Sequence, residues 1–258
     1  MSRKLSRAEQ LALPALGVGA FLSLWWLRTR GASINEVPGP VATARGLADL
    51  LRSGVLAKNV VASLFRVAFG FSLAALLGVP LGIIVGWYAR AHATLNPVIQ
   101  ALRPISPIAW LPIATLWFGS GDLAAVFLIF LSSFFPIVVS TASAVRSIEG
   151  RYLRAAENFA VHGVDLAARV ILPAAMPQIV TGLRVALGIA WVVVVAAEML
   201  GVNSGLGYQV NDARNNLRFD LVTAAMVVIG VIGYLLDLGL RSAEQRLLAQ
   251  RGATGNAR

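Results

Sequence analysis

The sequence predicts an all-α integral membrane protein with about six transmembrane helices. Of its 258 residues, 57% are hydrophobic and 13% are charged, whereas soluble domains carry roughly 25% charged residues. There is no charged residue between Arg66 and Arg90, and none between Asp122 and Arg146. Because a helix of about 20 apolar residues crosses a bilayer, each of these two stretches is long enough to form a span.

Four further segments are weaker candidates for spans: residues 11–27, about 95–118, about 179–200 and about 221–240. Any one of them, taken alone, also fits a buried helix in the core of a soluble protein. Six such segments in one chain exclude that class of protein. We therefore divide the chain into a cytoplasmic N-terminus at 1–10, one transmembrane domain at 11–240 and a cytoplasmic tail at 241–258.

The formal net charge of +10 is explained by membrane topology. When both termini are placed inside, most basic residues fall in the interior segments, as the positive-inside rule requires. This orientation places residues 28–58 and 201–220 outside. The lipid membrane is then the expected partner, and nucleic-acid binding is not needed to account for the charge.

Before the second span, residues 44–55 have the apolar periodicity of an amphipathic helix on the outer membrane surface. The second span itself carries a small residue at every fourth position, at Gly78, Gly82 and Gly86. Such a face lets helices approach closely in a membrane. The seam lies either within one subunit or between two, and the sequence does not separate these two arrangements.

The third span contains four prolines, at Pro97, Pro104, Pro107 and Pro112. Each proline removes a backbone donor, so we expect this helix to be kinked or broken. Broken helices at membrane depth line cavities or contact partners. We therefore expect the third and fifth spans to line a translocation path, with Ser106, Trp117 and Glu198 as candidate residues.

Glu198, near the outer end of the fifth span, is the strongest charged candidate within the membrane. One interpretation is that it lines the path or contacts an outer gate. The other is that it reaches water or pairs with a basic residue for structural reasons only. Arg184 and Asp237, near the inner ends of their spans, are expected to extend their side chains toward water.

No catalytic or metal site is predicted. The chain has no cysteine, and its two histidines, His92 and His162, are far apart and lack metal-ligand spacing. We interpret both as surface residues of inner loops. No phosphate-binding GxxxxGK[ST] loop is present either. We therefore expect a protein that is not an enzyme and holds no cofactor, with any ATP bound by a partner subunit.

A polar segment, RAAENFAVHGVDLAARVILP at residues 154–173, separates the fourth and fifth spans on the inner face. Tyr152, Ala155, Ala156 and Phe159 share one face of its first helix, and Arg154 and Glu157 are spaced as an i,i+3 pair. His162 and Gly163 break this helix before a second one begins. A soluble partner is expected to dock on this loop, at about 146–178.

The segment resembles the EAA loop of permease subunits in ATP-binding-cassette (ABC) importers. The family pattern is EAA, three residues, G, nine residues, then I-x-LP. Those positions hold here Arg154-Ala155-Ala156, Ala160, and Val170 to Pro173, with Leu172 and Pro173 as the LP pair. The spacing is intact, but arginine stands for the family's glutamate and alanine for its glycine. Most of the chain after Pro38 is also similar to the sulfonate, taurine and nitrate branch of these permeases.

This resemblance implies a multi-pass protein of the bacterial plasma (inner) membrane with an EAA-type cytoplasmic coupling helix. It implies a second permease subunit, which we expect to be an identical copy, two ATP-binding subunits that grip the coupling helix, and an exported solute-binding protein. The substrate implied is an organosulfonate, such as an aliphatic sulfonate or taurine, or a nitrate-like anion. The alternative is an ion-coupled secondary transporter or a channel, which needs ion-coordinating residues near the midplane of the membrane.

Overall fold

Long helices that run from one end of the molecule to the other form the body of the protein. The computed structural model describes residues 7–31 and 37–255. The first helices are α1 (Arg7–Thr29), α2 (Pro40–Arg52), α3 (Val55–Trp87), α4 (Ala89–Leu102), the 3-10 helix η1 (Pro107–Trp110), α5 (Leu111–Phe118) and α6 (Asp122–Arg146). They are followed by α7 (Gly150–Asn158), α8 (Gly163–Leu166), the π-helical turn η2 (Ala167–Ile171), α9 (Leu172–Gly201), α10 (Leu206–Asn215) and α11 (Phe219–Gly255).

Among the described residues, four helical stretches are long and apolar enough to cross a membrane: Val55–Trp87, Asp122–Arg146, Ala167–Gly201 and Phe219–Ser242. They correspond to the predicted second, fourth, fifth and sixth spans. The predicted first span lies in α1. The predicted third span is not one helix, because the chain leaves helical structure after Leu102 and resumes it at Pro107.

The glycine face of α3 packs against α6 within the same chain, which answers the question that the sequence left open. A Cβ atom on Gly82 would lie 2.6 Å from the Cβ of Thr141, and one on Gly86 would lie 2.7 Å from the carbonyl oxygen of Ala142. No side chain fits at such distances, so the two backbones are in close contact. Small residues drive helix association in membranes in this way.

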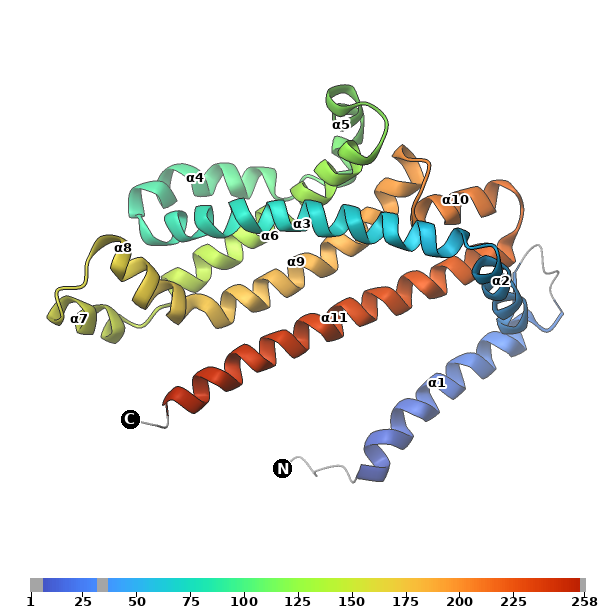
Figure 1. Cartoon of the computed structure of the whole chain (residues 1–258), viewed down its shortest axis with the longest axis horizontal. Coiled ribbons are helices and arrows are strands. Elements are labelled where there is room, and N and C mark those ends of the chain that lie inside the picture. Colours follow the sequence, from blue (N-terminus) through green and yellow to red (C-terminus); the bar gives the residue numbers. More distant parts are fainter. Residues whose placement is uncertain (1–6, 32–36, 256–258) are drawn as a thin grey trace.

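The helices α3, α6 and α9 form the centre of the fold, and α4 runs back beside α3 (Figure 1). In the same view, α7 and α8 lie at one end of the molecule, and α2 and α10 lie at the other. The C-terminal end of α11 lies toward the α7 end, and α1 reaches α2 with its last turn. We refer to the α7 end as the inner end and to the α10 end as the outer end.

Candidate functional site

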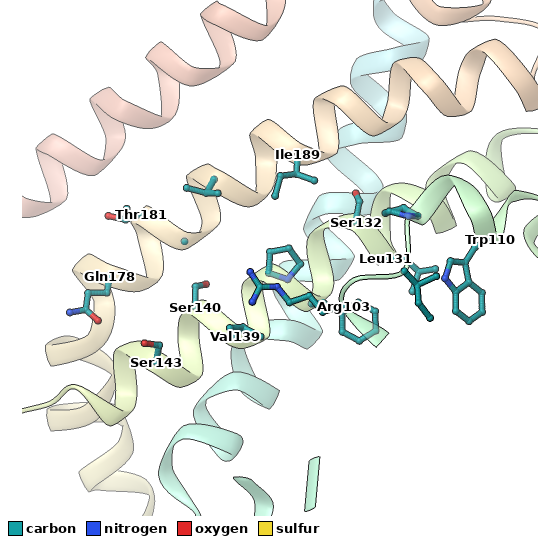
Figure 2. A pocket seen from close by; sticks show the side chains of 16 residues that line it. Arg103, Trp110, Leu131, Ser132, Val139, Ser140, Ser143, Gln178, Thr181 and Ile189 are labelled. Carbon is teal, nitrogen blue, oxygen red and sulfur yellow. The ribbon is translucent and has the colours of Figure 1, made fainter. Parts of the chain in front are cut away.

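A cavity of about 640 Å³ lies where the broken third span meets α6 and α9. From the broken span it is lined by Arg103, Ile105, Pro107 and Trp110. From α6 it is lined by Leu131, Ser132, Phe135, Pro136, Val139, Ser140 and Ser143, and from α9 by Gln178, Thr181, Gly182, Val185 and Ile189. Figure 2 shows Arg103 lying across α6, between Ser140 and Leu131. We refer to this space as the central cavity.

The polar groups of the central cavity come from one face of α6 and from the inner half of α9. Ser132, Ser140 and Ser143 recur at helical spacing along α6, and Gln178 and Thr181 face them from α9. All five side chains are neutral. Arg103 is the one charged side chain among the lining residues, and no carboxylate is among them. The cavity therefore combines apolar walls, neutral hydrogen-bonding groups and a single positive charge.

A smaller cavity of about 250 Å³ continues toward the inner end, and it shares Val139 and Ser143 with the central cavity. It is lined by His92 and Asn96 of α4 and by Arg146 at the end of α6. His92, predicted as a surface histidine, is therefore partly buried in a cavity wall. His162 is exposed, as predicted. The two cavities together extend from the broken span toward the inner end.

None of the three predicted path residues is among those that line the central cavity. Ser106 is exposed and lies between two residues that do line it, Ile105 and Pro107. Trp117 lies on α5, where its ring packs edge-on against Phe127 at 5.9 Å between centroids. The sequence analysis did not single out Arg103, although it falls within the predicted third span at about 95–118. A lone arginine within a proline-broken apolar segment was the signal that could have found it.

Glu198 is fully buried and belongs to an ionic network at the outer end. Its Oε1 accepts a hydrogen bond from Nη1 of Arg66 at 2.6 Å. Its Oε2 accepts from the hydroxyl of Ser63 at 2.8 Å and from the backbone N–H of Gly207 at 2.9 Å. The structure therefore supports the second interpretation of Glu198, that of a carboxylate paired with a basic residue.

Arg66 is the centre of this network, and it is only 2% exposed. Its Nε and Nη2 donate to Oδ1 of Asp122, at 2.9 and 2.6 Å. Its Nη2 also donates to Oγ of Ser204 and its Nη1 to the carbonyl oxygen of Ser204, at 2.6 and 2.8 Å. With the bond to Glu198, all five guanidinium donors have partners. The network joins α3, α6, α9 and the loop before α10.

A second ionic group joins α9 to α11 in the inner half of the molecule. Arg184 donates from Nε to Oδ1 of Asp237 at 2.7 Å and from Nη2 to Oδ2 at 3.0 Å. Glu244 lies 3.5 Å from Arg184 and also accepts from the hydroxyl of Thr181. Arg184 and Asp237, which are expected to extend toward water, are 29% and 47% exposed and also pair with each other in a bidentate contact.

The inner loop forms two short helices, as the sequence indicates, and a groove of about 570 Å³ runs between them and the start of α9. The groove is lined by Tyr152, Ala155, Ala156, Phe159, Val161, Arg169, Val170, Pro173 and Ala174. Phe159 is 82% exposed, which is unusual for so large an apolar side chain. Ala156 is 5% exposed, so most of its side chain packs within its own chain.

The charged residues of this loop pair differently from the expected i,i+3 arrangement. Arg151 pairs with Glu149 at 2.7 Å, and Arg169 pairs with Asp165 at 3.1 Å. Arg154 and Glu157 are both exposed, and neither takes part in an ion pair within the described residues. Both remain available to a partner.

The two other predicted residues of the loop have structural roles. Gly163, at φ +61°, begins α8 after the turn. Leu172 packs on the buried cluster that contains Ile171 and Ala175.

Comparison with known proteins decides which family these features belong to. Residues 78–249 match the family described as binding-protein-dependent transport system inner membrane component. This match covers well over half of the chain. The chain belongs to this family. It is therefore a permease of the ABC importer type and a multi-pass protein of the inner membrane, and such permeases act with a separate ATPase and a solute-binding protein.

Three relatives show how far the similarity extends. The permease is 35% identical to the taurine transport system permease protein TauC of Escherichia coli, over 96% of this chain and 92% of TauC. It is 34% identical to the aliphatic sulfonates transport permease protein SsuC of Bacillus subtilis, over 94% of this chain and 87% of SsuC. It is 36% identical to the bicarbonate transport system permease protein CmpB of Synechococcus elongatus, over 90% of this chain and 87% of CmpB.

The fold is also found in a solved structure. The permease superimposes on a chain of the MetNI methionine ABC transporter, in a structure titled as inward facing, with a TM-score of 0.68. The alignment covers 76% of this chain and 97% of that chain at 16% identity. At this identity the likeness concerns the fold alone.

The permease departs from the family pattern at Ala160, and the structure shows the physical consequence. Ala160 has φ +53°, in the left-handed region. Its N–H donates to the carbonyl oxygen of Glu157 at 2.9 Å, and the N–H of Val161 donates to that of Ala156 at 3.0 Å. This pair of bonds is the Schellman motif, in which glycine is preferred because it has no Cβ. The EAA pattern has glycine at this position, and glycine adopts this left-handed conformation without strain.

Replacing Ala160 with glycine is expected to stabilise the end of α7. A left-handed L-residue costs about 1–2 kcal/mol, and removal of the Cβ relieves part of that strain. Hydrogen exchange of the Val161 amide should slow by about fivefold for a gain of about 1 kcal/mol. The control is Ala155→Gly, in the middle of the same helix, which should speed exchange because glycine costs roughly 0.5–1 kcal/mol there. If the Val161 amide exchanges at the same rate in Ala160→Gly and in the unaltered permease, the backbone at Ala160 is not strained.

Proposed function

We propose that this permease forms the path by which an ABC importer takes up a small oxyanion, either an organosulfonate such as taurine or an aliphatic sulfonate, or a nitrate-like anion. The similarity to TauC and SsuC over most of the chain carries this proposal. The central cavity supports it, because its lining contains one arginine and no carboxylate. The solute passes from the outer end through this cavity and leaves through the smaller one that ends near Arg146.

The assembly that we propose contains two copies of this chain, two ATPase subunits and an exported solute-binding protein. A second copy is supported by the lining of the central cavity, where Val185 and Ile189 remain 59% and 37% exposed in the single chain. A second copy would cover this apolar rim. ATP binds to and is hydrolysed by the ATPase subunits, and this chain supplies no residue to that reaction.

The inner groove is the proposed contact with the ATPase. Phe159 projects from the end of α7, and Tyr152, on the same face of the helix, is 47% exposed. An exposed aromatic side chain beside a groove is a typical anchor of a protein interface. Arg154 and Glu157 flank it with two charges that have no partner in the described chain. ATPase movements would reach α9 through Pro173 and the first turn of that helix.

Replacing Phe159 with serine tests this function. In proteoliposomes that contain the assembled transporter, we expect ATP-driven uptake of radiolabelled taurine or ethanesulfonate to fall at least tenfold, because a hot-spot aromatic contributes about 2 kcal/mol or more to an interface. The control is Leu116→Ser on α5, since Leu116 is also 82% exposed but lies outside the inner loop. Normal uptake in Phe159→Ser, with the ATPase still bound, would show that this groove does not couple the two subunits.

A further inference from the structure

The length of α4 indicates that Arg103 lies at the depth of the hydrocarbon core, where an arginine is costly. It directly follows α4, which begins near the inner end and has 14 residues. At 1.5 Å per residue, such a helix rises by about 21 Å, and the hydrocarbon core of a bilayer is about 30 Å thick. Charged residues at such depth face cavities, are paired, and mark the paths of substrates or ions.

The other deep arginines of this chain have carboxylate partners, but Arg103 has none. Arg66 binds Asp122 and Glu198, and Arg184 binds Asp237. In the part of the chain that the structure describes, the guanidinium of Arg103 takes part in no hydrogen bond or ion pair. Instead it lines the central cavity, whose other polar lining groups come from α6 and α9 (Figure 2). Its donors are therefore free to bind a molecule in the cavity.

The long spans of a second copy would offer no unpaired carboxylate to this charge. The acidic residues within the four long spans are Asp122, Glu198, Asp220 and Asp237. Each of them is already paired with an arginine of its own chain: Asp122 and Glu198 with Arg66, Asp220 with Arg218, and Asp237 with Arg184. The broken span contains no acidic residue. A bound anion can therefore supply the balancing negative charge.

We infer that Arg103 is the specificity-determining residue of the permease, and that it binds the oxyanion headgroup of the solute halfway along the path. A planar guanidinium donates two parallel hydrogen bonds to a sulfonate, nitrate or carboxylate, which selects such groups over neutral or cationic ones. The hydroxyl of Ser143 and the amide N–H groups of Gln178 complete the contact, because the hydroxyls of Ser132 and Ser140 donate to carbonyl oxygens of their own helix. This inference rests on the proposed function, because it concerns the same cavity and the same solute.

Uptake of radiolabelled ethanesulfonate into proteoliposomes with the complete transporter tests the inference. We expect kcat/KM for uptake to fall at least tenfold in Arg103→Gln and by a smaller factor in Arg103→Lys, because lysine keeps the charge but cannot donate the two parallel hydrogen bonds. The matched control is Arg90→Gln, which removes the same charge from the exposed first turn of α4, outside both cavities. It should transport normally. Thermal unfolding should be unchanged in all three variants, because Arg103 has no partner to lose.

The outcomes separate this inference from the proposed function. ATP-driven uptake that is equal in Arg103→Gln and the unaltered permease would overturn the role of Arg103 and leave the importer function standing. An equal loss in Arg103→Gln and Arg103→Lys would also overturn it, because the charge would then not be what the solute recognises. Absence of uptake of ethanesulfonate, taurine and nitrate by the unaltered transporter would instead count against the proposed substrate class.

Discussion

Replacing Arg66 with methionine is expected to lower the free energy of unfolding by about 3–5 kcal/mol, because the change leaves Glu198 as a buried charge without its partner. Glu198 has no exposed surface, so water cannot replace the lost guanidinium. The change also removes the donors that hold both the carbonyl and the hydroxyl of Ser204. We expect a large fall in the unfolding temperature of the purified permease in detergent, with the loop before α10 loosened first.

Two further variants show whether the buried pair is the cause. Arg218→Met removes an arginine that is half exposed and pairs with Asp220 and Asp49, and this loss should cost only about 0.2–1 kcal/mol. The double variant Arg66→Met, Glu198→Met removes both buried charges, and it should recover most of the stability lost in the single variant. A double variant as unstable as Arg66→Met alone would show that packing, rather than the unpaired charge, causes the loss.

The sequence predicted the long spans well because their signal is composition over many residues. The charge-free stretches after Arg66 and Asp122 lie in α3 and α6, and the regularly spaced glycines of α3 form the contact between these two helices. The third span was predicted to be kinked or broken, and it is broken between Leu102 and Pro107. Residue spacing alone does not say where α4 ends, so Arg103 was not identified as a residue that lines the cavity.

The pairing of charges could not be predicted, because it depends on which helices become neighbours. Arg66 and Glu198 are 132 residues apart, and Arg184 and Asp237 are 53 apart. A single sequence contains no signal for such contacts. The structure of the short inner loop was easier to predict, because its helices and its turn depend on local residues. Even there, the burial of Ala156 depends on how α7 sits against the rest of the loop.

The family pattern was informative at Ala160 for a reason that the structure supplies. Its spacing located the position, and the backbone conformation there explains why glycine suits it. Arg154 has no comparable account, and nothing in the chain explains why an arginine stands in place of glutamate.

The paired charges of the long spans indicate which energy source can drive uptake. No carboxylate of the four long spans is free to bind a coupling ion, because each is paired with an arginine. The chain has no phosphate-binding loop of its own either. Uptake should therefore depend completely on a partner that hydrolyses ATP, and a proton or sodium gradient should not replace it.

The most direct measurement compares these energy sources in one preparation. Proteoliposomes are made with the permease, its ATPase and its solute-binding protein, and uptake of radiolabelled taurine or ethanesulfonate is followed with ATP, with a proton gradient and with a sodium gradient. We expect uptake only with ATP, and no uptake when the ATPase is left out or carries an inactivating substitution. Uptake driven by either gradient in vesicles that contain the permease alone would contradict it.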